Sequence, residues 1–172
     1  FISIQQQMEA SEDPMSLSDV IVNRIRRAVR EGKPFKCIIV LPMFPEGNPL
    51  EDSITLRIMY WQLQTIQYIE QKIREMTPAQ LTGPSDYINF YSIANCASVG
   101  GVPQLEQIYV HAKLLITDDI AICGSANLNM RSLMGDRDSE ICVVVENPEF
   151  CESLRRELWA EHLGSRTAKK LT

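Results

Sequence analysis

The feature that most constrains the fold is an apolar repeat of helical period across residues 53–76. Large apolar side chains recur there every three or four positions, which is the spacing of one face of an α-helix. Pro78 follows the repeat, and a proline just beyond a helix prevents the helix from continuing. We therefore predict a helix over 53–76 that packs one apolar face on a core. The side chains of this face are Leu56, Met59, Leu63, Ile66, Ile69, Ile73 and Met76.

Two further helical patterns lie on either side of this repeat. In "SLSDVIVNRIRRAVREGK", Ser16 or Ser18 can cap a helix that Gly32 ends, and "PEFCESLRRELWAEHLG" predicts a closing helix. Apolar runs between the helices predict strands, several of them buried, and the polar stretch "NCASVGGVPQ" separates two of these runs. The runs are "FKCIIVLPMF", "YINFYSI", residues 107–116, residues 120–123 and "EICVVVE".

The order of these elements predicts the fold class. Strands and helices roughly alternate, which favours an α/β sandwich with a mixed β-sheet flanked by helices. At 172 residues the chain is one domain, or one half of a two-lobed unit, and it can bury a real core. We place an irregular segment at 1–16, the folded lobe at 17–164 and a polar tail at 165–172.

Composition narrows the functional class. The 17 basic and 22 acidic residues give a net charge of −5, which argues against broad electrostatic capture of nucleic acid or anionic membrane. A local basic pocket is still compatible with this charge. The five cysteines lie mostly in apolar runs and predict buried, reduced thiols of an intracellular protein. No apolar run approaches the ~18 residues that a membrane span needs.

A histidine and a lysine stand two residues apart in "IYVHAKLLITDD". In a strand such residues share one face, so we expect His111 and Lys113 to lie roughly 6–7 Å apart on one side. An imidazole can attack phosphorus or move a proton, and an ammonium group stabilises charge that develops on a phosphate oxygen. Either residue alone is most simply an ordinary surface or core group.

The segment "GSAN" follows soon after. It supplies a tight turn at Gly124, a hydroxyl on Ser125 and an amide on Asn127. If a helix starts there, its free backbone N–H groups also favour an anion. The order H-x-K-x4-D and then G-S-x-N rarely arises by accident, although Asp118 alone is a simple turn residue. Together these segments predict a phosphate site with a histidine directed into it.

These motifs resemble the signature of the phospholipase D superfamily. The run "GSANLNMRSLMGDRDSEI", with "VLPMFPEG" and "YWQLQT", is similar to the C-terminal catalytic half of its eukaryotic, plant-like branch. The resemblance spans about residues 36–164 and implies one lobe of a pseudo-two-fold, two-lobed enzyme. One spacing differs: five residues separate Asp118 from Gly124, where the family has six. We expect a shorter turn that shifts Asn127 slightly.

The resemblance implies hydrolysis of the distal phosphodiester of phospholipids such as phosphatidylcholine. The products are phosphatidic acid and a free alcohol, with transfer to a competing alcohol as an added reaction. His111 is expected to protonate the leaving alcohol and then activate water, while Lys113 and Asn127 hold phosphate oxygens. Ser125 is expected to orient neighbouring groups, and Asp118 to position the end of the strand. Glu140 is expected to hydrogen-bond a histidine of the site.

The same chemistry needs a second histidine, which attacks phosphorus to form a phosphohistidine while the first one donates a proton. His162, near the end of the closing helix, is expected to be structural. The partner histidine is therefore expected from an upstream half with its own H-x-K motif, or from a second copy of the chain. On this view the chain alone is nearly inactive.

The resemblance also sets the expected cofactors, partners and location. No metal is required for the chemistry, and no zinc-like ligand spacing is present; calcium acts in plant-like members through a separate domain. The expected substrate is a phospholipid at a membrane surface, with no nucleic acid and a cytoplasmic, peripherally membrane-bound location. Two alternatives stay open: another phosphodiesterase of the superfamily, such as a nuclease or phosphatidyltransferase, and a lobe that binds phospholipid without catalysis.

Overall fold

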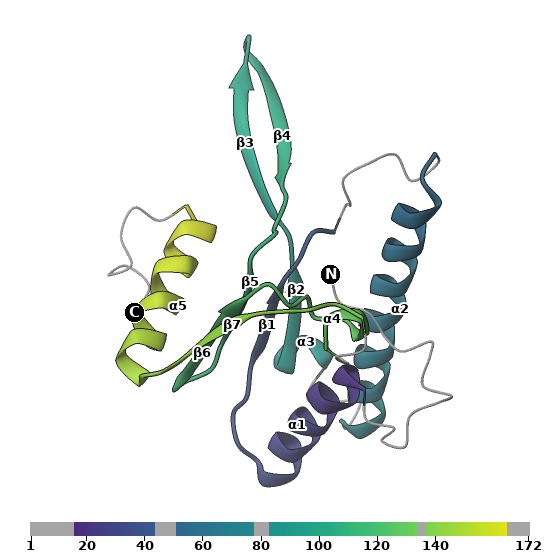
Figure 1. Ribbon diagram of the computed structural model, residues 1–172, viewed down its shortest axis with the longest axis vertical. Helices are drawn as coiled ribbons and strands as arrows, with labels where there is room; N and C mark the ends of the chain where they lie inside the picture. Colours follow the sequence, from purple (N-terminus) through teal and green to yellow (C-terminus); the bar gives the residue numbers. More distant parts are fainter. Residues whose placement is uncertain (1–15, 44–50, 78–82, 134–136, 165–172) are drawn as a thin grey trace.

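The computed structural model describes residues 16–43, 51–77, 83–133 and 137–164. Helices and strands alternate over much of this length, and the strands form both parallel and antiparallel pairs, so the predicted α/β class is confirmed (Figure 1). The elements are α1 (Leu17–Glu31), β1 (Cys37–Val40), α2 (Ser53–Met76), α3 (Pro84–Tyr87), β2 (Ile88–Tyr91), β3 (Ile93–Val99), β4 (Val102–Ile108), β5 (Lys113–Ile116), β6 (Ile120–Gly124), α4 (Met130–Leu133), β7 (Cys142–Glu146) and α5 (Pro148–His162).

The strands are divided among three small sheets, whereas the sequence pattern predicted one mixed sheet. β1 and β2 pair in parallel, β3 and β4 form an antiparallel hairpin, and β5, β6 and β7 form an antiparallel sheet in that order. The predicted segments 1–15 and 165–172 lie outside the described residues. No helix in the described part of the chain combines the length and apolarity needed to cross a bilayer.

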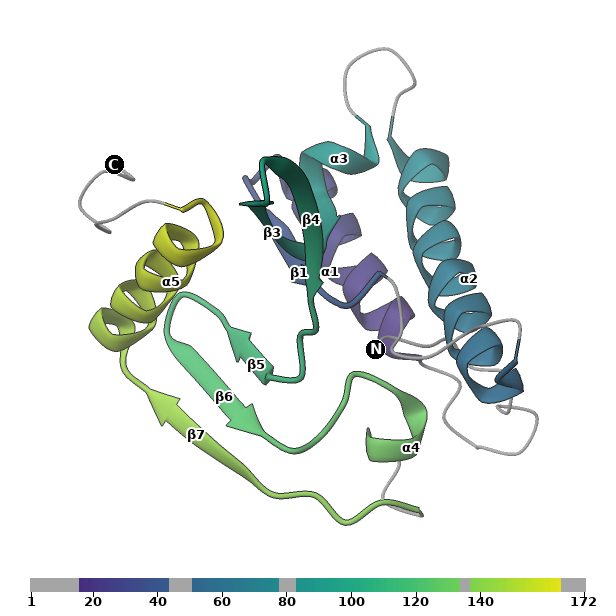
Figure 2. The same cartoon turned by 90° about the horizontal axis from the view of Figure 1, so that it is seen from above.

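The core lies where α1 and α2, side by side in Figures 1 and 2, cover the β1–β2 pair. Ile25, Ile69 and Ile73 are fully buried there. Burying one such side chain contributes about 1.5–3 kcal/mol, so this small cluster carries much of the packing energy that holds the two helices on the strands. The buried cluster consists of Val22, Ile25, Leu41, Ile69, Ile73 and Ile88.

The ends of α1 are set by its own sequence. Ser16 accepts a hydrogen bond from the backbone N–H of Asp19, and the Asp19 carboxylate accepts from the backbone of Ser16, which forms a capping box. Of the two predicted caps, Ser16 is therefore the correct one, and Ser18 is buried instead. At the other end Gly32 adopts φ 61°, the left-handed conformation that glycine tolerates best.

A hydrogen bond between Tyr68 and Asp19 joins α2 to the start of α1. The Tyr68 hydroxyl donates to Asp19 Oδ1 at 2.6 Å. This bond to the carboxylate, with some burial, raises the pKa of Tyr68 to about 12. Burial acts to raise the pKa of Asp19, but its hydrogen bonds with Tyr68 and Ser16 outweigh burial and lower it.

The predicted bounds of α2 are confirmed, but its buried face differs in the first half of the helix. Ile69 and Ile73 face the core as expected, whereas Leu56 and Leu63 are about half exposed, at 55% and 52%. Thr55, Gln62 and Thr65 are buried instead. The reason is that this half of α2 borders a cavity rather than the apolar core, as described below.

The hairpin of β3 and β4 was not predicted, because a polar, glycine-containing stretch was interpreted as a connection. Gly100 and Gly101 have φ values of 60° and 82°, and a pair of positive φ angles is what a tight two-residue hairpin turn requires. The hairpin projects from the rest of the molecule (Figure 1). The prediction of a single strand over 107–116 is also wrong, because β4 ends at Ile108 and β5 begins only at Lys113.

The prediction that the β7 segment is buried is also wrong. Val143 and Val144 are 64% and 51% exposed. β7 is an outer strand of its sheet, paired only with β6 among the described strands. The closing helix α5 has the predicted position, and its buried Cys151 and Ala160 mark the side that packs inward.

The cysteines are free, as predicted, but not generally buried. Cys151 is buried, Cys37 is half-buried, and Cys96, Cys123 and Cys142 are exposed. Burial raises the pKa of the Cys37 thiol, which keeps that thiol protonated over a wider pH range.

Candidate active site

His111 lies in the connection between β4 and β5, not inside a strand. The backbone leaves regular pairing at residues 109–112 and resumes it at Lys113, the first residue of β5. The imidazole stacks on the ring of Tyr109, with ring centroids 6.1 Å apart and an angle of 28° between the planes. We predicted that both side chains lie on one face of a single strand; this is wrong for His111, which lies outside regular strand pairing.

His111 and Lys113 nevertheless line the same cavity. This cavity has a volume of about 310 Å³ and lies between the first half of α2 and the β4–β5 connection. His111, Lys113 and Asn127 together give it one polar wall. The wall from α2 combines the apolar side chains of Ile58 and Met59 with the buried polar side chains of Thr55 and Gln62. The structure thus brings three of the six predicted site residues to one place.

The ammonium group of Lys113 is held close to the histidine backbone. Lys113 Nζ donates to the carbonyl oxygen of His111 at 2.5 Å. In the described part of the chain no carboxylate forms an ion pair with Lys113. An ammonium group has three N–H donors, so two are free of this carbonyl contact and its positive charge is available to an anion in the cavity.

Ser125 and Glu140 connect the end of β6 to the segment before β7. The backbone N–H of Ser125 donates to the carbonyl of Ile141 at 3.0 Å, and the backbone N–H of Ile141 donates to Ser125 Oγ at 3.1 Å. The Ser125 hydroxyl also donates to Glu140 Oε2. We expected Glu140 to bond a histidine; in the described residues its hydrogen bond is to Ser125, and the two residues do not line the cavity.

Asn127 is held in place by anchors on both sides. Ser125 fixes the chain before it, and Asn129 fixes the chain after it. Asn129 is 4% exposed, and its side-chain oxygen accepts from the backbone N–H of Ser132 at 3.0 Å, which caps α4. This cap was missed in the sequence, although an asparagine just before "MRSL" was a detectable signal. The short segment between two anchors keeps the Asn127 amide at the cavity.

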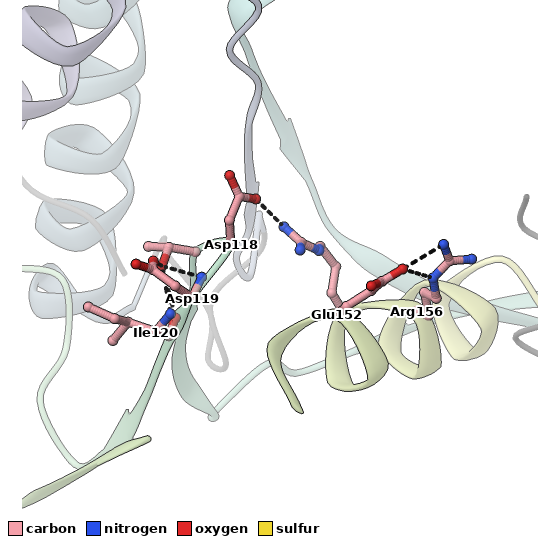
Figure 3. A network of polar contacts seen from close by, with 7 residues as sticks. Asp118, Asp119, Ile120, Glu152 and Arg156 are labelled. Carbon is pink, nitrogen blue, oxygen red and sulfur yellow. Dashed lines mark hydrogen bonds and ion pairs between the residues drawn. The ribbon is translucent and has the colours of Figure 1, made fainter. Parts of the chain in front are cut away.

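Asp118 lies at the β5–β6 turn, away from the cavity. Its side chain is 99% exposed and pairs with Arg155 of α5 at 3.2 Å. Figure 3 shows Asp118 directed toward α5, where Glu152 and Arg156 form a second ion pair. Four residues lie between Lys113 and Asp118, and three of them belong to β5, which places the two residues at opposite ends of this strand. Asp118 therefore holds a strand end and is too far from the cavity to touch a ligand there.

The turn that follows Asp118 is tight. The backbone N–H of Thr117 donates to the carbonyl of Ile120 at 2.8 Å, which closes a tight connection. Beyond it Lys113 pairs with Gly124, and Asn127 still lines the same cavity as His111. Among the residues that the structure describes, no group of three or more His, Cys, Asp or Glu side chains could hold a metal ion.

An α/β fold that brings H-x-K and G-S-x-N segments to one cavity is the arrangement expected of the phospholipase D superfamily. The phospholipase D family model matches residues 4–107 and 103–172. Phospholipase D zeta 2 of Arabidopsis thaliana is 41% identical over 171 residues, which covers 85% of this chain and 16% of the relative. Phospholipase D1 of Schizosaccharomyces pombe is 36% identical over 173 residues, which covers 88% of this chain and 13% of the relative.

The chain belongs to the phospholipase D family. It spans less than one-fifth of the length of these curated relatives, at 16% and 13%. The similarity therefore covers nearly all of this chain but a minor part of each relative.

Proposed function

We propose that this chain supplies one half of a phosphodiesterase site that cleaves the distal phosphodiester of phospholipids such as phosphatidylcholine. The products are phosphatidic acid and a free alcohol. The observation that carries this proposal is the meeting of His111, Lys113 and Asn127 at one cavity. The relatives, which are named phospholipase D, support the substrate class.

The phosphate binds against the polar wall. The Lys113 ammonium, held close by the His111 carbonyl, and the Asn127 amide N–H groups are donors for the non-bridging phosphate oxygens. A positive charge already in position stabilises the negative charge that grows on these oxygens in the transition state. Stabilising one such developing charge is worth about 3–4 kcal/mol in other enzymes.

His111 moves the protons in both steps. In the first step its imidazolium donates a proton to the oxygen of the departing alcohol while a second imidazole attacks phosphorus. In the second step neutral His111 takes a proton from water, whose oxygen bonds to phosphorus as the phosphorus–nitrogen bond breaks. A competing primary alcohol in place of water gives a phosphatidyl-alcohol.

The second imidazole comes from outside this chain. His162, the other histidine, lies exposed in the last turn of α5 and does not line the cavity. An upstream half with its own H-x-K motif is the source we favour, because the chain matches only 16% of the length of a relative. A second copy of the chain related by a two-fold axis is the other source.

Three residues outside the cavity act through position. Ser125 and Glu140 hold the end of β6 against the start of β7, which fixes the position of Asn127 at the polar wall. Asp118 ties the other end of β5 to α5. We expect the protein to act at the cytoplasmic surface of a membrane, where its lipid substrate lies, and its chemistry to require no metal.

The test uses the complete gene product with phosphatidylcholine and a primary alcohol. We expect phosphatidic acid and phosphatidyl-alcohol from the wild type and loss of both, by at least about a hundredfold, in His111→Ala. His162→Ala is the matched control and keeps wild-type turnover, because this second histidine is exposed and remote from the cavity.

Three other outcomes would refute the proposal in different ways. Equal lipid turnover by the wild type and His111→Ala would remove the histidine from the mechanism. Nicking of plasmid DNA without any phosphatidyl-alcohol would favour a nuclease of the same superfamily. Binding of phospholipid vesicles with no turnover would favour a lobe that binds lipid without catalysis.

A further inference from the structure

One buried amide on the α2 wall of the cavity has a side-chain oxygen without a hydrogen-bond partner in the described part of the chain. Gln62 is 5% exposed and lines the cavity from α2. Its Nε2 donates to the carbonyl oxygen of Pro42 at 2.9 Å, which fixes which end of the amide is the oxygen. Its Oε1 is buried and has no hydrogen-bond partner in the described part of the chain.

This free acceptor is unusual within its surroundings. Of the two buried side-chain atoms without a partner among the described residues, Gln62 Oε1 and Ser132 Oγ, only the first belongs to a residue that lines the cavity. The other polar side chain of the α2 wall, Thr55, donates its hydroxyl to Asp52 at 2.6 Å. A buried acceptor without a donor is costly, and its cost is relieved when a bound molecule supplies one.

The chemistry of the acceptor restricts which molecule can do this. A phosphodiester presents only acceptor oxygens at neutral pH, so it binds the donors of Lys113 and Asn127 and gains nothing from Gln62 Oε1. The molecule at Gln62 must carry an O–H or N–H group. Gln62 lines the same cavity as His111, so a molecule bound beside the histidine also lies beside this residue.

Water in the second step of the proposed reaction meets this requirement. One O–H bond of the water breaks as its proton passes to His111, the new oxygen–phosphorus bond forms, and the phosphorus–nitrogen electron pair returns to the second imidazole. The other O–H bond stays intact and can donate to Gln62 Oε1 throughout. A primary alcohol has only one O–H bond, and its proton passes to His111. The carbon of the alcohol would then face Oε1, and the acceptor would remain unpaired.

We propose that Gln62 is a specificity-determining residue that favours water over alcohols as the acceptor of the phosphatidyl group. This inference rests on the function proposed above, because it concerns the second step of that reaction. It assigns to α2 a part in the choice of products, separate from the phosphate binding and proton transfer of the polar wall.

The test is the ratio of two products formed in one reaction mixture. The complete gene product is incubated with phosphatidylcholine vesicles and a fixed concentration of ethanol, and phosphatidylethanol and phosphatidic acid are quantified. Gln62→Met, which has similar length and no acceptor of comparable strength, is expected to raise the phosphatidylethanol to phosphatidic acid ratio about fivefold. Gln62→Glu keeps an acceptor oxygen and is expected to keep the ratio within about twofold of the wild type.

Gln67→Met is the matched control, since Gln67 is exposed on the same helix. Its ratio should equal that of the wild type. A Gln62→Met ratio equal to the wild type, with both products formed, would overturn the inference and leave the proposed function intact. If the wild type itself forms neither product, the proposed function fails and the inference fails with it. Should Gln62→Met yield no lipid product, Gln62→Glu decides: an unchanged ratio supports an acceptor role, and a fivefold rise overturns it.

Discussion

The contact between the ends of β6 and β7 offers the sharpest test of the site geometry. Gly124 is the last residue of β6, and a Cβ added there would lie 2.4 Å from the carbonyl oxygen of Ile141 and 2.7 Å from the Cβ of Cys142. The φ angle of Gly124 is not positive, so the backbone itself tolerates alanine. Gly124→Ala must therefore push the start of β7 away from β6, for reasons of space alone.

The expected loss of local stability follows from the contacts between β6 and β7 at Gly124. Overpacking of a close contact costs about 1–3 kcal/mol. The hydrogen bonds that join Ser125 to Ile141 and Glu140 lie next to Gly124, and losing one of them costs about 1 kcal/mol more. The local free energy of opening should therefore fall by about 2–4 kcal/mol. This corresponds to roughly thirtyfold to a thousandfold faster amide exchange, because about 1.4 kcal/mol is a factor of ten.

Hydrogen–deuterium exchange, followed by mass spectrometry on the complete gene product, measures this local opening directly. The peptides that contain the amides of Ser125 and Ile141 should lose protection in Gly124→Ala. Gly83→Ala is the matched control, because a Cβ there meets nothing nearer than Ser85 Oγ at 4.0 Å. Exchange in Gly124→Ala that equals that of the wild type would refute the close approach of these strands, and with it the positioning of Asn127 described above.

Three further predictions concern charge. Lys113→Ala should lower kcat by about a hundredfold or more, while Lys113→Arg restores lipid binding but not turnover; equal kcat in wild type and Lys113→Ala would exclude charge stabilisation. Asp118→Asn should leave kcat within about twofold of the wild type, since its ion pair with Arg155 is exposed, and a hundredfold loss would contradict its remoteness. The raised pKa of Tyr68 adds stability that is complete below pH 10 and is lost as pH rises toward about 12. In urea unfolding, the free energy of unfolding of Tyr68→Phe should therefore fall less between pH 10 and about 12 than that of the wild type, because the bond to Asp19 is missing. An equal dependence of this free energy on pH in both proteins would exclude the bond.

Periodicity predicted the three long helices α1, α2 and α5, which have strong end signals, but not the four-residue helices α3 and α4. The repeat over 53–76 with Pro78 beyond it gave the bounds of α2, and Ser16 and Gly32 gave those of α1. The β3–β4 hairpin was missed because its apolar and polar residues do not alternate cleanly on an exposed ribbon. The Gly100–Gly101 pair was its only local signal.

The candidate site was partly predictable for a related reason. His111, Lys113 and Asn127 belong to short motifs, so their residue types and spacing could be recognised without knowledge of the fold. Gln62 could not be recognised, because a glutamine in an amphipathic helix has no pattern of its own until the cavity beside it is known. The partner of Glu140 also depended on how β6 meets β7, which the sequence does not encode locally.

The bond from Lys113 Nζ to the carbonyl of His111 closes a small ring that includes the backbone between the two residues. The cation is thereby tethered to the main chain that carries the imidazole, and it cannot move far from that main chain without opening the ring. Only residues 109 and 110 lie between the end of β4 and the first residue of this ring, His111. A displacement of the projecting hairpin would consequently act first on the backbone of this ring, which carries the imidazole and holds the ammonium group.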